Sequence, residues 1–91
     1  MQVKVQYLGL IRSKTEKKSE KVDLREGALL SDLLNKLVEV YGEAIKNLFA
    51  DESQNILDPN FIVTVNGKSL PTDTKLKEGD TVSFMTVISG G

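Results

Sequence analysis

The residues best suited to covalent chemistry in this sequence are the last two, Gly90 and Gly91, which carry the α-carboxylate of the chain. A carboxylate is a poor acyl donor until it is activated, for example as an acyl-adenylate. An activating enzyme must reach it through a narrow channel, and glycine lets the backbone approach closely and bend freely. An activated Gly91 could accept sulfur to give a thiocarboxylate, or an amine to give an isopeptide.

Other kinds of chemistry find little support in the residue types present. The sequence contains no Cys and no His, which excludes a thiolate nucleophile, a Cys-ligated zinc and an imidazole base. It has no Gly-rich phosphate loop and no metal-ligand spacing, so we expect no bound metal. The neighbouring acids Asp51 and Glu52 fall in an expected loop. The pattern therefore favours a carrier or a binding module over an enzyme that acts alone.

Length and composition predict one small domain over residues 1–91. Hydrophobic residues make up 40% of the 91 and charged residues 27%, as is typical of a globular protein. The net charge is −1, so no overall field favours a nucleic-acid partner. No apolar run approaches the ~20 residues of a membrane span, and the start lacks the pattern of a signal peptide. We expect a cytoplasmic protein with neither membrane nor nucleic acid as a direct partner.

The charge is distributed unevenly along the chain. Residues 1–25 contain seven basic and three acidic residues, and the other 66 contain five basic and ten acidic residues. We interpret the basic part as an ordinary solvated loop, with a role in partner choice as the alternative.

The first part of the chain has the pattern of a β-hairpin. Residues 3–7 alternate apolar and polar, which predicts a half-buried strand that continues to Ile11. In such a strand Leu8 and Leu10 lie on the face opposite Val3 and Val5. The polar residues 13–19 predict a loop, and residues 21–24 alternate again as the returning strand.

The rest of the chain predicts one main helix followed by a second hairpin and a last strand. Apolar residues at helical spacing run from Leu30 to Tyr41, Gly42 is a natural end, and residues 44–49 predict a further helical turn. The β-branched run 61–65 is followed by Asn66-Gly67, which is typical of a type I′ hairpin turn. Residues 68–70 form the short return, and residues 81–88 form the last strand.

This order of elements predicts an α+β fold, the ubiquitin-like β-grasp, with a mixed sheet of four to five strands packed on one main helix. The first and last strands are expected to be parallel, adjacent and central. The expected domain spans residues 1–91 and ends in a flexible tail over residues 89–91.

The predicted sheet leaves apolar side chains on the face opposite the helix. On the first strand these are Leu8 and Leu10, and on the last strand they are Met85 and Val87. Exposed apolar patches mark interaction sites, so we interpret these residues as a partner-binding surface. Leu70, at the edge of the second hairpin, is a weaker member.

The sequence resembles the small sulfur-carrier subunits of molybdopterin synthase, the MoaD-like proteins, and more broadly the ubiquitin-like sulfur carriers. The resemblance covers nearly the whole chain, and its most specific parts are Val65-Asn66-Gly67, residues 76–82 and Ser89-Gly90-Gly91. It implies that Leu8, Met85 and the tail residue Ser89 face partner proteins.

The same resemblance implies a course of chemistry at the terminus. A partner enzyme of the ubiquitin-activating type would adenylate Gly91 with ATP and Mg²⁺, while the carrier itself binds no cofactor. The resulting thiocarboxylate would donate sulfur to a pterin precursor in the large subunit of molybdopterin synthase.

One departure keeps other members of the wider family open. Thr86-Val87 stands where these small subunits usually have two prolines, which stiffen an extended tail. The alternatives are a thiamin-type or tRNA-thiolating carrier, a modifier joined to lysines of target proteins through the same terminus, and a β-grasp module that binds without covalent chemistry.

Overall fold

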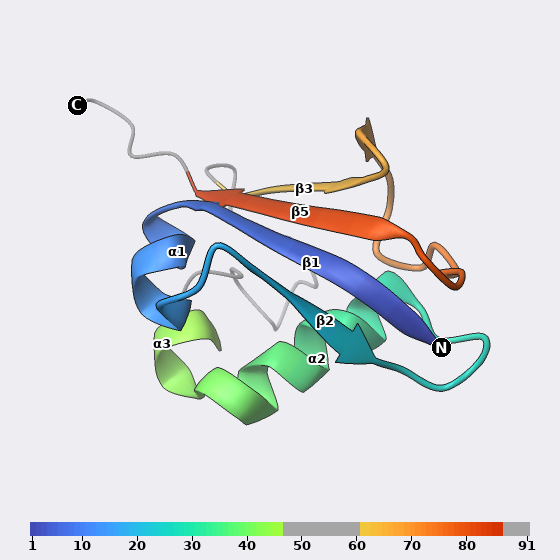
Figure 1. Ribbon diagram of the computed structural model, residues 1–91, viewed down its shortest axis with the longest axis horizontal. Coiled ribbons are helices and arrows are strands. Elements are labelled where there is room, and N and C mark those ends of the chain that lie inside the picture. Colours follow the sequence, from blue (N-terminus) through green and yellow to red (C-terminus); the bar gives the residue numbers. More distant parts are fainter. Residues whose placement is uncertain (47–60, 87–91) are drawn as a thin grey trace.

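The structure is a computed structural model that describes residues 1–46 and 61–86. Five strands form one sheet in the order β2-β1-β5-β3-β4, and the helices cover one of its faces (Figure 1). The strands are β1 (Gln2–Gly9), β2 (Ser19–Asp23), β3 (Phe61–Val65), β4 (Lys68–Ser69) and β5 (Thr81–Thr86); the helices are α1 (Leu10–Thr15), α2 (Leu30–Tyr41) and α3 (Glu43–Lys46).

The pairing of the strands confirms the predicted β-grasp. Strand β1 runs parallel to β5, with Lys4 opposite Thr81 and Gly9 opposite Thr86. On the outer sides, β2 pairs antiparallel with β1, and β3 pairs antiparallel with β5. The first and last strands are therefore central and adjacent, as the order of the elements predicted. The predicted loop over residues 51–60, the helical positions 47–49 and the end of the last strand, residues 87–88, lie outside the described residues.

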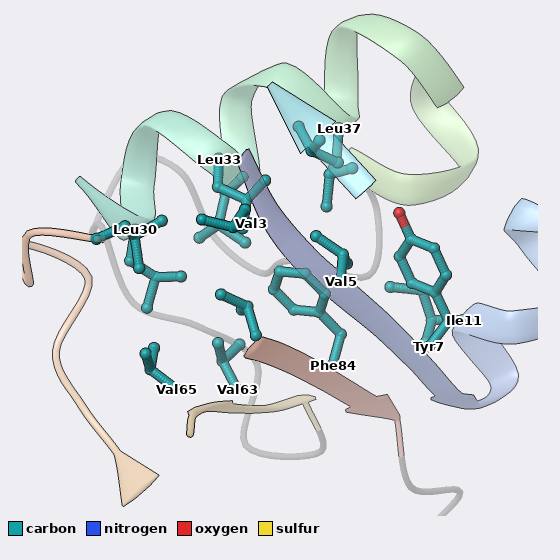
Figure 2. Close-up of a cluster of buried hydrophobic side chains, with 14 of the residues drawn as sticks. Val3, Val5, Tyr7, Ile11, Leu30, Leu33, Leu37, Val63, Val65 and Phe84 are labelled. Carbon is teal, nitrogen blue, oxygen red and sulfur yellow. The ribbon is translucent and has the colours of Figure 1, made fainter. Parts of the chain in front are cut away.

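The core lies between the sheet and α2, as Figure 2 shows. Strands β1 and β5 contribute side chains of alternate residues, because successive side chains of a strand point to opposite faces. All of the labelled core positions are less than a tenth exposed, and each contributes roughly 1.5–3 kcal/mol by burial. They include Val3, Val5, Tyr7, Leu30, Leu33, Leu37, Val63, Val65 and Phe84.

Helix α2 begins without a capping hydroxyl, because its N-cap residue is Leu29. The backbone of the segment before β5 replaces the missing cap, because Leu30 and Ser31 donate their N–H groups to the carbonyls of Thr74 and Thr72, each at 2.9 Å. The Asp32 carboxylate accepts the Leu29 N–H at 2.8 Å. The usually unsatisfied donors of a helix start are thus paired with tertiary neighbours.

The prediction that the first strand continues to Ile11 is wrong, since β1 ends at Gly9 and α1 follows at once. Gly9 has φ 75° and ψ −145°, a conformation open to glycine and strained for other residues. Leu10 is therefore the first residue of a helix and does not share a strand face with Leu8. Helix α1 also takes up part of the predicted 13–19 loop, and Ile11 reaches the core from it.

Replacement of Gly9 tests this turn. Gly9→Ala is expected to lower the free energy of unfolding by about 1–3 kcal/mol, because a Cβ is disfavoured at this φ and ψ. Urea unfolding measures the loss. Asn35→Ala, at an exposed position of α2, is the control and is expected to change stability by less than about 0.5 kcal/mol. Equal stability of Gly9→Ala and the wild type would contradict the turn.

Candidate functional site

The candidate site is the corner of the sheet from which the C-terminal tail departs. Thr86 is the last residue of β5, and its partner on β1 is Gly9. The tail positions singled out in the sequence, Val87 and Ser89 to Gly91, lie outside the described residues. The structure describes Thr86, which we call the tail root, and the surface around it.

Three apolar side chains form a row across the central strands at this corner. Leu8 of β1 and Ile62 of β3 lie on either side of Met85 of β5, each as its cross-strand partner. Each has a buried neighbour on its own strand, respectively Tyr7, Val63 and Phe84, so the three point away from the helices. Leu8 is 43% exposed, Ile62 40% and Met85 37%. We call Leu8, Met85 and Ile62 the apolar row.

The remainder of the same face is polar. Next along β1 and β5 lie Gln6 and Ser83, which are cross-strand partners joined by a hydrogen bond of 3.0 Å from Ser83 Oγ to Gln6 Oε1. Lys4 and Thr81 follow in the same register. The apolar part of the face is therefore confined to the end of the sheet nearest the tail.

The structure places the predicted partner-binding residues in different positions relative to the apolar row. It places Leu8 and Met85 side by side, as the predicted parallel pairing required. Leu70 is exposed but follows the end of β4, and none of the strand registers brings it into the apolar row. Leu10 is removed from the strand by the turn at Gly9. Sequence reasoning missed Ile62, although a strand with Ile at 62 and Val at 63 and 65 is apolar on both faces.

A second polar cluster lies on the helix side of the sheet. Glu20 of β2 is opposite Val5, whose side chain is buried, so its carboxylate faces the core. Tyr7 Oη donates to Glu20 Oε2 at 2.6 Å, and Tyr41 Oη of α2 donates to the same oxygen. Lys17 Nζ lies 3.3 Å from Glu20 Oε1. Figure 2 shows the Tyr7 hydroxyl pointing toward the helix layer.

This arrangement changes the pKa of each member. Burial alone would raise the pKa of Glu20, but the hydrogen bonds from Tyr41, Tyr7 and Lys17 outweigh it, and the pKa is lowered. Burial, followed by the Glu20 carboxylate, raises the pKa of both Tyr7 and Tyr41. The tyrosines therefore stay neutral and donate to an ionised Glu20. Through Glu20 the cluster links the edge strand β2 to α2, so its role is structural.

The cluster makes stability depend on pH. The pKa of Tyr7 is raised from its ordinary value of 10.0, so above about pH 10 the unfolded chain loses this proton while the folded chain keeps it. The stabilisation is full below pH 10 and is expected to fall above it, by up to about 1.4 kcal/mol per pH unit. Tyr7→Phe should reduce this alkaline slope, which urea unfolding across the alkaline range would measure. An unchanged slope would show that the Tyr7 proton is not linked to folding.

Two findings bear on other classes of function. Within residues 1–46 and 61–86, no group of three or more acidic residues is arranged to hold a metal ion. None of the helices in the described part of the chain is long and apolar enough to cross a membrane.

Comparison with known proteins gives matches of fold and of family. The ThiS family model matches residues 5–91. Among curated proteins, a sequence comparison found no match. A putative molybdopterin converting factor, subunit 1, from Pyrococcus furiosus is 27% identical, with a TM-score of 0.78 over 97% of this chain and 99% of that one.

Two further solved structures are similar over almost their full lengths. Urm1 from Trypanosoma brucei is 26% identical, with a TM-score of 0.79, covering 99% of this chain and 95% of that chain. SAMP1 from Haloferax volcanii is 20% identical, with a TM-score of 0.85 and complete coverage of both chains, and supports the fold. The match over residues 5–91, together with the β-grasp sheet, shows that the chain belongs to the ThiS family of ubiquitin-like sulfur-carrier and modifier proteins.

Proposed function

We propose that this protein is a sulfur carrier whose reactive group is the carboxylate of Gly91, and that it serves as the small subunit of a molybdopterin synthase. The observation that carries the proposal is the position of the tail root. Strand β5 ends next to β1 at the apolar row, and Ser89-Gly90-Gly91 follows a few residues later. A partner that covers the apolar row is therefore held beside the tail.

The chemistry requires only the terminus and its partner. Attack of the Gly91 carboxylate on the α-phosphorus of ATP releases pyrophosphate and leaves an acyl-adenylate. Attack of hydrosulfide, or a sulfur nucleophile at the same oxidation level, on the acyl carbon expels AMP and leaves a thiocarboxylate. In this scheme ATP and Mg²⁺ belong to an adenylating enzyme of the ubiquitin-activating type. The pterin precursor is then held by the large subunit.

The similarity to the Pyrococcus furiosus protein supports the molybdopterin role, since its name assigns it to molybdopterin conversion. A second candidate is a Urm1-type carrier or modifier. It is favoured by the similarity to Trypanosoma brucei Urm1 and by Thr86-Val87 at the positions where molybdopterin-synthase small subunits usually carry prolines.

Intact-protein mass spectrometry tests the proposal. The chain is incubated with ATP, Mg²⁺, a sulfide donor and an extract of its own cells. The expected result is a mass gain equal to the replacement of one oxygen by sulfur, located at Gly91 by fragmentation. Conversion of the chain into larger isopeptide adducts on lysines would favour the modifier. A tail that stays unmodified in the presence of ATP would overturn the covalent role.

A further inference from the structure

Basic side chains gather at the same corner, on the helix side of the tail root. A depression in the surface is lined by Gly9, Arg12, Ser13, Glu16, Lys17 and Lys18. The three basic side chains among these residues are exposed. We call Arg12, Lys17 and Lys18 the basic corner.

The backbone beneath the basic corner is held in place by hydrogen bonds. The Glu16 N–H donates to the Arg12 carbonyl, and the Tyr7 N–H donates to the Lys18 carbonyl, both at 2.9 Å. The Lys17 N–H donates to Oγ1 of the buried Thr15 at 3.3 Å. Glu16 itself has a φ of 60°, the left-handed conformation that is costly for a non-glycine residue. The turn is thus fixed before any partner binds, which lowers the entropy cost of binding.

Two of the three basic side chains at the basic corner form no ion pair within the described part of the chain, and Glu16 is the one acidic residue in the lining of the depression. Lys17 pairs with Glu20, whereas Arg12 and Lys18 form no ion pair with any residue in the ranges 1–46 and 61–86. The wider sequence adds to this asymmetry, with seven basic and three acidic residues before residue 26 and the opposite excess after it. Such a distribution orients an approaching molecule of opposite charge.

The basic corner lies at the same end of the sheet as the candidate site, on the helix side, whereas the apolar row lies on the opposite face. Gly9 lines the depression and is also the cross-strand partner of Thr86, the root of the tail. Leu8, one residue earlier, belongs to the apolar row. A protein that covers the apolar row and also extends around this end of the sheet therefore reaches the basic side chains.

We propose that the basic corner binds an acidic segment of the adenylating enzyme, the partner that takes up the C-terminal tail for activation. The inference rests on the proposed function, because it assigns this surface to the same partner. This contact raises the rate of association and orients the partner as it approaches. Exposed charge pairs add little affinity individually but raise association rates.

The surroundings favour an acidic protein segment over a nucleic acid. Single-stranded nucleic acids bind where bases can stack on exposed aromatic rings beside basic residues. Two rings that the structure places near the basic corner are not available in this way. Tyr7 is 1% exposed, and the ring of Tyr41 is overlaid by Lys17 Nζ at 5.9 Å from its centroid.

The first test is an NMR titration of the ¹⁵N-labelled full chain with a short oligoglutamate peptide. Chemical-shift changes are expected at residues 9–18, and they should disappear when salt rises from about 20 mM to about 300 mM. Arg12→Glu/Lys18→Glu is expected to weaken association about tenfold or more. Lys68→Glu/Lys75→Glu makes the same change of charge on β4 and the loop after it, and should bind like the wild type. Arg12→Gln/Lys18→Gln separates lost attraction from added repulsion.

Several results would overturn the inference. These are binding that Arg12→Glu/Lys18→Glu leaves unchanged, shift changes spread over all lysines, and tighter binding of a single-stranded oligonucleotide of equal charge at the same residues. All three double variants change exposed side chains, and their spectra report whether they fold.

The second test uses the adenylating enzyme, purified from the extract that modifies the chain in the mass assay. Arg12→Glu/Lys18→Glu is expected to raise the KM for the carrier about tenfold with kcat unchanged. An unchanged KM would contradict the assignment to this partner. The two proposals fail separately, because the peptide titration does not involve Gly91. An unmodified Gly91 in the wild type would overturn the sulfur-carrier function, whereas the peptide titration would still report whether the basic corner binds an acidic segment.

Discussion

Deletion of Gly91 is expected to abolish ATP-dependent modification of the chain while leaving its fold unchanged. The loss of one residue withdraws the carboxylate by about 3.3–3.6 Å along an extended tail. A misplacement of about 1 Å at a reacting group can already cost about 10²-fold in rate. The rate of pyrophosphate release and the mass gain at the terminus should therefore both fall by more than about 100-fold.

The free energy of unfolding is the control for this deletion. The described core residues all precede Thr86, so urea unfolding of the deletion variant should agree with the wild type to within about 0.5 kcal/mol. Addition of one Ala after Gly91 should be equally inactive, provided no protease removes it, because the carboxylate is then carried too far. A deletion variant modified at the wild-type rate would place the chemistry elsewhere and remove the basis for a carrier.

The fold could be predicted from the sequence because its elements have clear periodicity. Alternation marked β1 and β5, helical spacing marked α2, and Asn66-Gly67 marked the second hairpin. In the structure these two residues have φ angles of 52° and 84°, as a type I′ turn requires. The main error arose at Gly9, where apolar residues continue on both sides of a turn that only the backbone conformation of glycine reveals.

The candidate site was harder to predict because it depends on which residues are opposite one another. Leu8 and Met85 followed from the parallel pairing of the first and last strands. Ile62 belongs beside Met85 only in the observed register of β3 with β5, and a shift by one residue would have buried it. Glu20 was missed for a similar reason. Its partners Tyr7 and Tyr41 come from two other elements, and alternation with Val22 was the single signal that it faces the core.

A charge in the centre of the apolar row is expected to abolish binding of the partner that activates the tail. Met85 is flanked by Leu8 and Ile62, so Met85→Asp places an ionised group where an interface would exclude water. The variant loses the roughly 1.5–3 kcal/mol of burying the apolar side chain and adds the cost of an unpaired charge. Affinity for the adenylating enzyme should fall by at least about 100-fold, as calorimetry or surface plasmon resonance would measure. Leu8→Asp should act in the same way.

The matched control is Val40→Asp, which introduces the same charge at the most exposed large apolar residue among those the structure describes. Val40 is 62% exposed on α2, and this helix covers the opposite face of the sheet. It should bind the partner like the wild type, because no part of the apolar row changes. Leu70→Asp is expected to have a smaller effect than Met85→Asp, since Leu70 follows the edge strand β4. If Met85→Asp and Val40→Asp bound equally well, the partner would not use this face, and the tail would have to be captured without it.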